Sequence, residues 1–463
     1  MKIFWFFLLA LSLVLVACGS SGGSDPCDGW TCSEHGTCKV TDTKAKCDCD
    51  PFYEPSEDGT ECISTVNDPC APYDCSGHGR CRVDGEKNPY CECDNGWAQS
   101  GDKLDCIENN CQDDCGIMGC CGTSCCKAAP SNSDVIGTIE DNGVSKNASG
   151  TFDTDNDCVS GSTLGDCELV TVANGVDICT CRLSSLTIGS SLRVTGSAAL
   201  AILAWNTIDI SGVVDMSANS STSGPGAIAQ QDQEAAKWRG GKGGSNGTAG
   251  GNSADSPRSA TLVPLEGGQA GQDGCGGRAG GGGGGALQLV AGDSITINGS
   301  IHAGGGGGAG GQYDPDDQCI GGAGGGSGGS LLIEAPNVSY SGVFYANGGS
   351  GGGGGNNTGQ EGEPGRDAQS SSEPVQGGQG RDGASCALYG AIEGGDGGAG
   401  SSGDSKGGDG QDYDSNQCPD LFPYVGGGGG GGGAGRLRIN TREDCQCTGI
   451  FSPSPSYGYL KGL

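Results

Sequence analysis

The sequence predicts an all-β protein in which small disulfide-rich modules are followed by a glycine-rich parallel β-helix. The chain has 463 residues and 29 cysteines, most of which lie before residue 127, and twelve of these follow one repeated spacing. It also contains 97 glycines, gathered mainly in the second half. Between the glycine runs, short segments alternate apolar and polar residues as strands do. Because only 34% of the residues are hydrophobic and 5% aromatic, one large core is excluded.

Composition also limits the compartment and the partners. The formal net charge of -32 excludes nucleic acid as a partner, since binding to phosphates requires clustered Lys and Arg. Such a charge fits a solvated, self-repelling surface. So many cysteines place the mature chain in an oxidising compartment.

The first residues predict export. Lys2 precedes an apolar run that is too short to span a bilayer comfortably, so residues 1–17 are expected to be a signal peptide. The run ends in "LVAC", and residues 18–26 follow as a flexible tether rich in Ser and Gly. An ordinary signal peptide with a chance cysteine remains the alternative.

The "LVAC" stretch resembles the lipobox of bacterial lipoproteins. The resemblance implies cleavage before Cys18 and three acyl chains on that residue, which together anchor a protein firmly. Gly19, which follows, implies the outer membrane by the Gram-negative sorting rule. Lipidation of Cys18 would also leave 28 cysteines, an even number.

Two segments, 27–62 and 70–106, repeat one cysteine spacing. The gaps are four, five, eight, one and twelve residues in the first, and nine replaces eight in the second. Six cysteines allow fifteen connectivities, so the spacing alone assigns none. Modules this small depend on disulfides because they lack a sufficient core.

These segments resemble EGF-like modules, on the strength of "CSEHGTC", "CSGHGRC" and "CECDNGW". The resemblance implies the pairs Cys27–Cys38, Cys32–Cys47, Cys49–Cys62, Cys70–Cys81, Cys75–Cys91 and Cys93–Cys106. Neither module has the acidic consensus of calcium-binding members, so we expect no calcium there. His35 and His78 are interpreted as turn residues.

A cysteine-rich knot and a linker are expected next. Residues 111–126 contain six more cysteines, without the CxxC pairs or the nearby His that would favour zinc, so three local disulfides are expected. The polar segment 127–157 is interpreted as a linker.

Residues 158–463 are expected to form the β-helix. Segments beginning at Ala199, Ala286, Ser330 and Arg436 share an apolar pair two residues apart, a turn, a second pair and a glycine. The first pairs are Leu200/Ile202, Leu287/Leu289, Leu331/Ile333 and Leu437/Ile439. A unit of about twenty residues cannot bury this face alone, but stacked copies can.

Three glycine-rich inserts separate the repeats: 219–285, 304–329 and 347–435. They leave at an equivalent place each time, so they should emerge on one side of the stack. Glycine runs can form extended helices with three residues per turn, which could pack side by side as a hydrogen-bonded layer. Disordered surface loops are the alternative.

The remaining cysteines suggest further disulfides. Cys158, Cys167, Cys179 and Cys181 are expected to close the N-terminal end of the stack. Two disulfides among Cys275, Cys319, Cys386 and Cys418 would join the inserts. Cys445 and Cys447 face the same side and are expected to find partners elsewhere.

Residues that could support catalysis or metal binding are few. His302 is expected to be solvated, and Asp209 is an isolated outward-facing acid. The weak candidate for a metal site is Asp412, Asp414 and Asn416, which alternate as in calcium loops but lack the downstream Glu. We therefore expect no metal, no cofactor and no enzymatic activity.

The chain resembles glycine-rich surface lipoproteins of the myxobacterial type, and its second half resembles PGRS-type repeats. The resemblance rests on the lipobox, the EGF-like modules and the glycine inserts. It implies a lipid-anchored outer-membrane protein that is exposed at the surface and binds an extracellular protein or glycan in adhesion. A polysaccharide-active β-helix enzyme and a passive coat component are the alternatives.

Overall fold

The computed structural model describes most of the chain after residue 128 and separate stretches before it. The described ranges are 129–173, 175–230, 238–253, 257–313, 320–356, 358–381, 394–411, 425–442 and 445–460, with Ala235. Earlier described ranges are 36–41, 44–49, 53–56, 62–64, 73–83, 89–93, 97–99, 104–108, 119–121 and 124–126, with Cys27, Cys32, Thr60 and Cys70. The predicted signal peptide, Cys18 and the tether lie outside the described residues. The chain divides into two compact units, Met1–Cys93 with Asp102–Cys106, and Asp94–Gly101 with Ile107–Leu463.

The N-terminal unit consists of short antiparallel hairpins. Strand β1 (Gly36–Thr41) pairs with β2 (Lys44–Cys49), β3 (Tyr53–Pro55) with β4 (Cys62–Ser64), and β5 (Gly79–Val83) with β6 (Pro89–Cys93). A short 3-10 helix, η2 (Cys75–Gly77), precedes β5. Further along the chain, outside the N-terminal unit except for Cys106, β7 (Trp97–Gln99) pairs with β8 (Cys106–Glu108), and β9 (Gly119–Cys121) with β10 (Ser124–Cys126).

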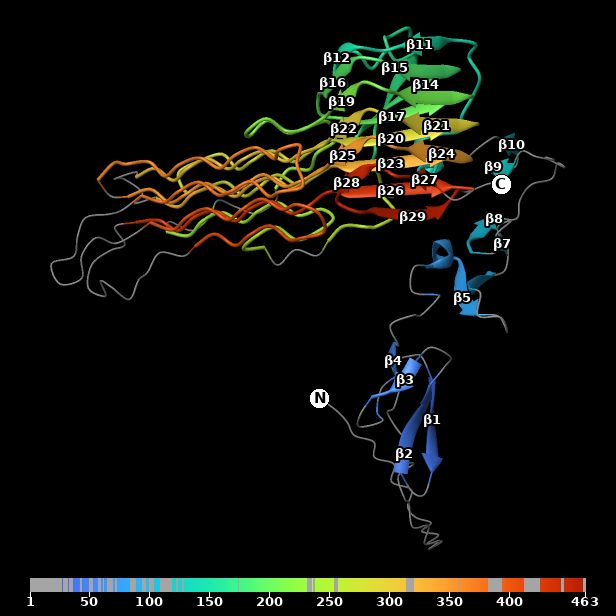
Figure 1. Cartoon of the computed structure of the whole chain (residues 1–463), viewed down its shortest axis with the longest axis horizontal. Helices are drawn as coiled ribbons and strands as arrows, with labels where there is room; N and C mark the ends of the chain where they lie inside the picture. Colours follow the sequence, from blue (N-terminus) through green and yellow to red (C-terminus); the bar gives the residue numbers. More distant parts are fainter. Residues whose placement is uncertain are drawn as a thin grey trace, which may run out of the picture. The chain divides into compact units, whose positions relative to one another are not determined.

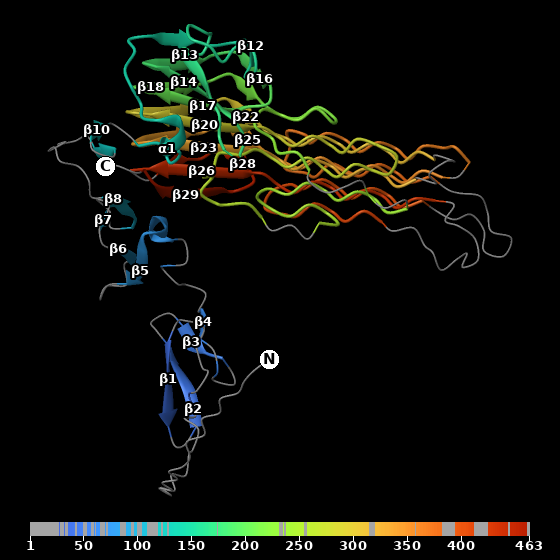
Figure 2. The same cartoon turned by 180° about the vertical axis from the view of Figure 1, so that it is seen from behind.

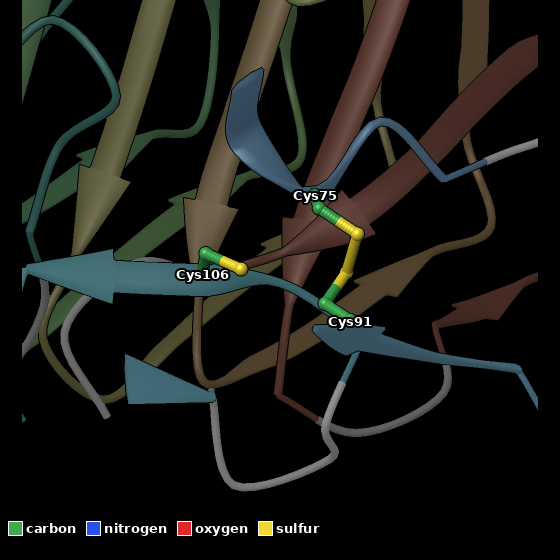
Figure 3. Close-up of side chains that lie close together, drawn as sticks. All are labelled: Cys75, Cys91 and Cys106. Atoms are coloured by element: carbon green, nitrogen blue, oxygen red, sulfur yellow. A yellow bond between two sulfur atoms is a disulfide. The ribbon is translucent and has the colours of Figure 1, made fainter. Parts of the chain in front are cut away.

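Disulfides hold these hairpins together. The structure contains Cys27–Cys38, Cys32–Cys47, Cys49–Cys62, Cys70–Cys81 and Cys75–Cys91. These are pairs that the EGF-like resemblance implies, and Cys32, Cys47 and Cys62 form a buried cluster. The Cys75–Cys91 disulfide lies beside the buried Cys106 (Figure 3). The side chain of Cys93, the expected partner of Cys106, lies outside the described residues.

Residues 129–460 form three long sheets, and the regular secondary structure of the described residues is nearly all strand, as predicted (Figure 1). The first sheet has the order β13 (Asp166–Val170), β14 (Ile178–Leu183), β17 (Ala199–Ala204), β20 (Ala286–Ala291), β23 (Ser330–Ala335), β26 (Arg436–Thr441) and β29 (Pro455–Tyr459). The second sheet has the order β11 (Ser145–Asn147), β15 (Ser185–Ile188), β18 (Thr207–Ile210), β21 (Ser294–Ile297), β24 (Asn337–Tyr340) and β27 (Gln446–Cys447). The third has the order β12 (Gly150–Asp153), β16 (Ser191–Thr195), β19 (Val213–Asp215), β22 (Ser300–His302), β25 (Val343–Tyr345) and β28 (Ile450–Ser452).

From β14 onward, the chain visits the first, second and third sheets in the same order on every turn. Every described pairing in these sheets is parallel except that of β13 with β14. Each strand therefore lies beside the equivalent strand of the turn before it. We call this assembly the stack.

The predicted apolar pairs form the interior of the stack. Leu200, Leu287, Leu331 and Leu437 pair in register along the first sheet, and each is at most 1% exposed. The second apolar pairs also lie in register, with Ile208 beside Ile295 and Ile295 beside Val338. The predicted superposition of the aliphatic rows is therefore confirmed.

The stack begins earlier than the sequence indicated. Strands β11 and β12 and the helix α1 (Ser133–Ile136) fall within 127–157, where a linker was expected. The segment is polar, and its strands join through backbone pairing with β15 and β16. Its buried aromatic side chain, Phe152, enters the interior. Short strands with so few apolar residues give little periodicity to detect.

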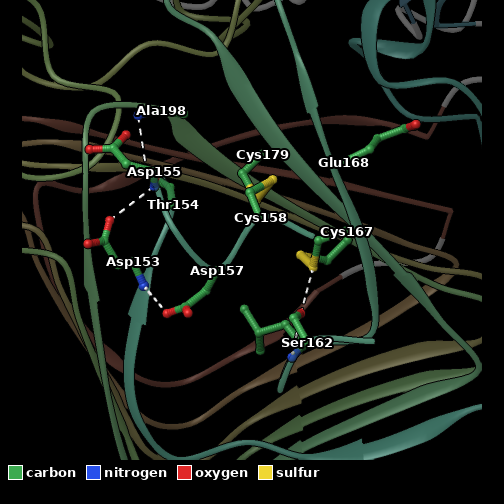
Figure 4. The surroundings of a disulfide bond; sticks show 12 residues. Asp153, Thr154, Asp155, Asp157, Cys158, Ser162, Cys167, Glu168, Cys179 and Ala198 are labelled. Atoms are coloured by element: carbon green, nitrogen blue, oxygen red, sulfur yellow. Dashed lines mark hydrogen bonds between the residues drawn. A yellow bond between two sulfur atoms is a disulfide. The ribbon is translucent and has the colours of Figure 1, made fainter. Parts of the chain in front are cut away.

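Two disulfides close the N-terminal end, as predicted. Cys158 pairs with Cys179, and Cys167 with Cys181. Near them, Thr154 accepts a hydrogen bond from the backbone amide of Ala198 (Figure 4). Asp155 accepts one from the backbone amide of Ser197, and the two bonds tie the first turn to the next.

Other cysteine predictions had mixed outcomes. Cys445 and Cys447 pair with each other, so the expectation of partners elsewhere is wrong. Their Cα atoms lie 5.2 Å apart, within the usual disulfide range, because the chain between them is bent; an extended chain would separate them by about 6.6 Å. Cys275 is disulfide-bonded, whereas Cys319, Cys386 and Cys418 lie outside the described residues.

All three inserts extend to one side of the stack, as predicted (Figures 1 and 2). We call their described residues, 219–230, 238–253, 257–285, 304–313, 320–329, 347–356, 358–381, 394–411 and 425–435, with Ala235, the glycine bundle. These runs are hydrogen-bonded to one another, so the alternative of disordered loops is wrong for the described residues.

The segment 347–355 shows how the bundle is held. Every third N–H donates to the same neighbour: Gly349, Gly352 and Gly355 donate to the carbonyls of Gly326, Ala323 and Ile320, at 2.9, 2.9 and 2.8 Å. The next set, Gly348, Gly351 and Gly354, donates to Ser401, Gly398 and Gly395, and the third set, Ser350 and Gly353, donates to Arg366 and Glu363. This period is that of an extended helix with three residues per turn.

The carbonyls of the same segment face further neighbours. They accept from 305–311, from 378–381 and from 426–432. Segment 347–355 is therefore surrounded by other extended segments, and the inserts form a bundle several layers deep rather than the thin layer expected.

Candidate interaction surface on the third sheet

A row of chemically diverse side chains crosses the outside of the third sheet. Pairing places Arg193 beside Asp215, Asp215 beside His302, and His302 beside Tyr345. Each residue follows a buried residue of its own strand, so strand alternation turns it outward. Neighbouring strands lie about 4.8 Å apart, so these side chains form one line, which we call the outer row.

Arg193 and Asp215 fix each other's orientation. Arg193 Nη1 lies 2.6 Å from Asp215 Oδ2, and Arg193 Nη2 donates to the Ser217 carbonyl at 2.6 Å. The Ser217 amide in turn donates to Asp215 Oδ1 at 3.0 Å. Because both side chains are about a third exposed, the pair contributes at most about 1 kcal/mol to stability. Its consequence is an ordered guanidinium at the surface.

His302 is half-buried between its neighbours. Its ring centroid lies 6.1 Å from that of Tyr345, with the planes tilted by 43°. Its Nδ1 lies 3.3 Å from Ser370 Oγ, which belongs to the glycine bundle. Burial lowers the pKa of His302 below its ordinary value, and the charge of Asp215 offsets part of that shift. The lowered pKa favours the neutral form of the ring near pH 7.

A second line of residues runs beside the outer row. Pairing aligns Ser191, Val213, Ser300, Val343 and Ile450 on the same face. Ile450 is 57% exposed, and Val213 and Val343 are half-buried. The face therefore combines aliphatic, aromatic and charged groups.

The geometry suits recognition better than a Ser-His-Asp relay. Such a relay needs the acid and the hydroxyl on opposite ring nitrogens of the histidine. Here Asp215 directs its oxygens to Arg193 and to the Ser217 amide. Among the described hydrogen bonds, His302 is paired with Ser370 and not with Asp215.

The structure places the other predicted residues as follows. Asp209 faces outward on β18 between Thr187 and Thr296, separate from the outer row. His302 is half-buried in a row, so the expectation of a solitary, solvated histidine is wrong; the third strand of the turn brings it beside Tyr345. Asp412, Asp414 and Asn416 lie outside the described residues, as does Cys18.

Sequence reasoning missed Arg193, Asp215 and Tyr345. The signal was present in the repeat alignment, because "SLR", "VVD", "SIH" and "VFY" occupy equivalent positions in the third strands. In each of them, the residue after the buried one is charged or aromatic.

Sulfur clusters in the described part of the chain are explained by disulfides. The two groups of three cysteines close enough to hold a metal contain the bonded pairs Cys75–Cys91 and Cys167–Cys181, with Cys106 and Cys179. Cys179 and Cys106 are themselves disulfide-bonded. Disulfide sulfurs are not thiolates, the form that binds metals.

Comparison with known proteins indicates neither a family nor a function. No family model matches the chain, and neither a curated protein nor a solved structure matches it significantly. Among the described residues, no helix has the length and apolar character needed to cross a bilayer.

Proposed function

We propose that the chain is a lipid-anchored protein of the bacterial cell surface that binds an extracellular partner protein through the outer row. The proposal joins the lipobox and EGF-like resemblances to the face described above. In this reading the chain is a glycine-rich outer-membrane lipoprotein that acts in adhesion without catalysis.

The second unit is best classified as a parallel β-helix. Three sheets visited in a fixed order, with the same strand of each turn in register, support this classification. Such a stack offers flat sheet faces on which residues from distant parts of the sequence align.

The outer row carries the proposal. Arg and Tyr are enriched among the residues that dominate protein interfaces, and an aliphatic surround excludes water from them. Here Tyr345 and Arg193 lie beside Val213, Val343 and Ile450. This combination of ordered charge, aromatic ring and exposed aliphatic groups favours a protein partner at this face.

The test is cell attachment by a deletion strain complemented with single variants. Tyr345→Ala and Arg193→Ala are expected to abolish most attachment, because truncating a central interface residue costs about 2 kcal/mol or more, which weakens binding about thirtyfold. Attachment to neighbouring cells and to a surface is scored at equal surface display.

Asp215→Asn should also reduce attachment, because it removes the carboxylate that orients Arg193. Asp209→Asn is its matched control, since both acids face outward on the same turn of the stack. The control should attach normally. Equal attachment by all variants would contradict the outer row as the binding face. A loss of glycan cleavage in Asp209→Asn would support the enzyme alternative instead, and normal attachment without the protein would support a passive coat.

The anchor is tested separately. Cys18→Ala should move the protein from the membrane fraction to the soluble fraction, because the acyl chains that hold it cannot be attached. Detergent phase partition and the mass of the N-terminal peptide measure this change. Retention of the variant in the membrane fraction would remove the lipid anchor from the proposal.

A further inference from the structure

A polar cleft opens in the glycine bundle, apart from the outer row. Its volume is about 790 Å³, and its side chains come from the segments 358–366, 375–381, 394–402 and 405–411. These side chains are Gln360, Glu361, Gln379, Arg381, Asp396 and Gln411. A cleft of this size holds a small ligand.

Backbone bonds hold the walls in place. The Arg381 amide donates to Gly354 at 3.0 Å, the Gln411 amide to the carbonyl of Asp396 at 2.9 Å, and the Glu363 amide to Gln379 at 2.9 Å. Each segment that lines the cleft is thereby hydrogen-bonded either to another lining segment or to the segment 347–355. Ligand binding would therefore cost little ordering of the backbone.

The charged side chains are also positioned. Arg381 donates through Nε to the Glu361 carbonyl at 3.0 Å, and its Nη2 lies 3.4 Å from Glu363 Oε1. Asp396 Oδ1 accepts from the Gly380 amide at 2.9 Å. These bonds orient a guanidinium and a carboxylate at the cleft before any ligand arrives.

The lining indicates a hydrophilic ligand. The described side chains that line it are amides, carboxylates and one guanidinium, whereas clefts for apolar ligands are lined mainly by hydrophobic groups. Three glutamines supply both donors and acceptors, which suits a ligand with many hydroxyls. Gly380 and Gly394 add no side chain, so a ligand can approach the backbone there.

The charge of the lining residues further restricts the class of ligand. Two acidic residues and one arginine line the cleft; Glu361 Oε2 also lies 3.6 Å from Arg278 Nη2, which leaves Asp396 as the acid without a described ion pair, and the whole chain has a net charge of -32. Both features disfavour uronic acids, sulfated sugars and other anions. We propose that this cleft is a binding site for a short uncharged oligosaccharide, independent of the protein partner at the outer row.

The test measures binding of cellotetraose, maltotetraose and N-acetylchitotetraose to the full chain by titration calorimetry, with a sulfated heparin tetrasaccharide as the anionic probe. At least one neutral probe should bind, and the heparin probe should not. Gln379→Ala and Gln411→Ala should each weaken that binding about tenfold, because each leaves a sugar hydroxyl without its partner.

Gln376→Ala is the matched control, because Gln376 is an exposed glutamine three residues earlier on the same segment and does not line the cleft. It should bind as the unaltered chain does, and so should Tyr345→Ala, which tests the outer row. No binding of any neutral probe, tighter binding of heparin, or an equal loss in Gln376→Ala would overturn the proposal.

Discussion

Gly349→Ala is expected to lower the free energy of unfolding of the second unit by about 3 kcal/mol, the upper end of the cost of overpacking. A Cβ at Gly349 would overlap the backbone carbonyl of Gly306, and a backbone group cannot turn away as a side chain can. The substitution must therefore separate two segments that are joined by hydrogen bonds at both ends. Denaturant unfolding measures the loss, and amide hydrogen exchange in 347–355 should become faster.

Gly189→Ala is the control for this change. Gly189 lies at a corner between β15 and β16, where an added Cβ would meet nothing within 4 Å. Its unfolding midpoint should be unchanged or slightly raised, because alanine restricts the unfolded chain. If the amides of 347–355 still exchange slowly in Gly349→Ala, the close approach of the glycine segments is not required for their protection.

Leu331→Ala is the second change with a large expected effect. Leu331 is fully buried in the interior of the stack, between Leu287 and Leu437 in the adjoining turns. Truncation leaves a cavity bounded by turns that are fixed by sheet pairing, so the structure cannot collapse to fill it. The expected loss in unfolding free energy is about 3–4 kcal/mol.

Leu169→Ala provides the comparison for Leu331. Leu169 lies on β13 and is 51% exposed, so its removal should change the unfolding free energy by less than about 0.5 kcal/mol. Both variants are measured by the same denaturant transition. If the two leucines had equal effects, the interior column would not be the source of stability.

The stack could be predicted because its buried apolar residues recur at regular positions in the sequence. Pairs such as Leu287/Leu289 and Leu331/Ile333 recur with one spacing, and the strands that contain them pair in register. The polar strands β11 and β12 carry no such pattern, so residues 127–157 were interpreted as a linker. Periodicity detects strands that bury side chains and misses those joined through the backbone alone.

The glycine bundle could be anticipated only in outline. Glycine has no side chain to indicate a face or a partner, so no residue pattern shows that 347–355 lies between the segments that contain Gly326 and Gly398. Which segments become hydrogen-bonded neighbours depends on where each insert leaves the stack and where it rejoins it. That information is spread over hundreds of residues rather than held in a motif.

The outer row was missed for a different reason. Inserts of unequal length separate Asp215, His302 and Tyr345, and no insert separates Arg193 from Asp215, so the sequence spacing of the four residues is irregular and does not group them. Only the alignment of turns places them on one line. The polar cleft was missed likewise, because its walls come from segments whose neighbours cannot be derived from composition.

The three-residue hydrogen-bonding period of the inserts restricts how their length can change. Adding or removing one residue would rotate every following amide by a third of a turn and direct it at a different neighbour. Adding or removing three residues would restore each amide to its original direction. Related proteins whose inserts differ in length within the bundle should therefore differ by multiples of three residues. The hydrogen bonding of the bundle thus restricts insertions and deletions to units of three residues.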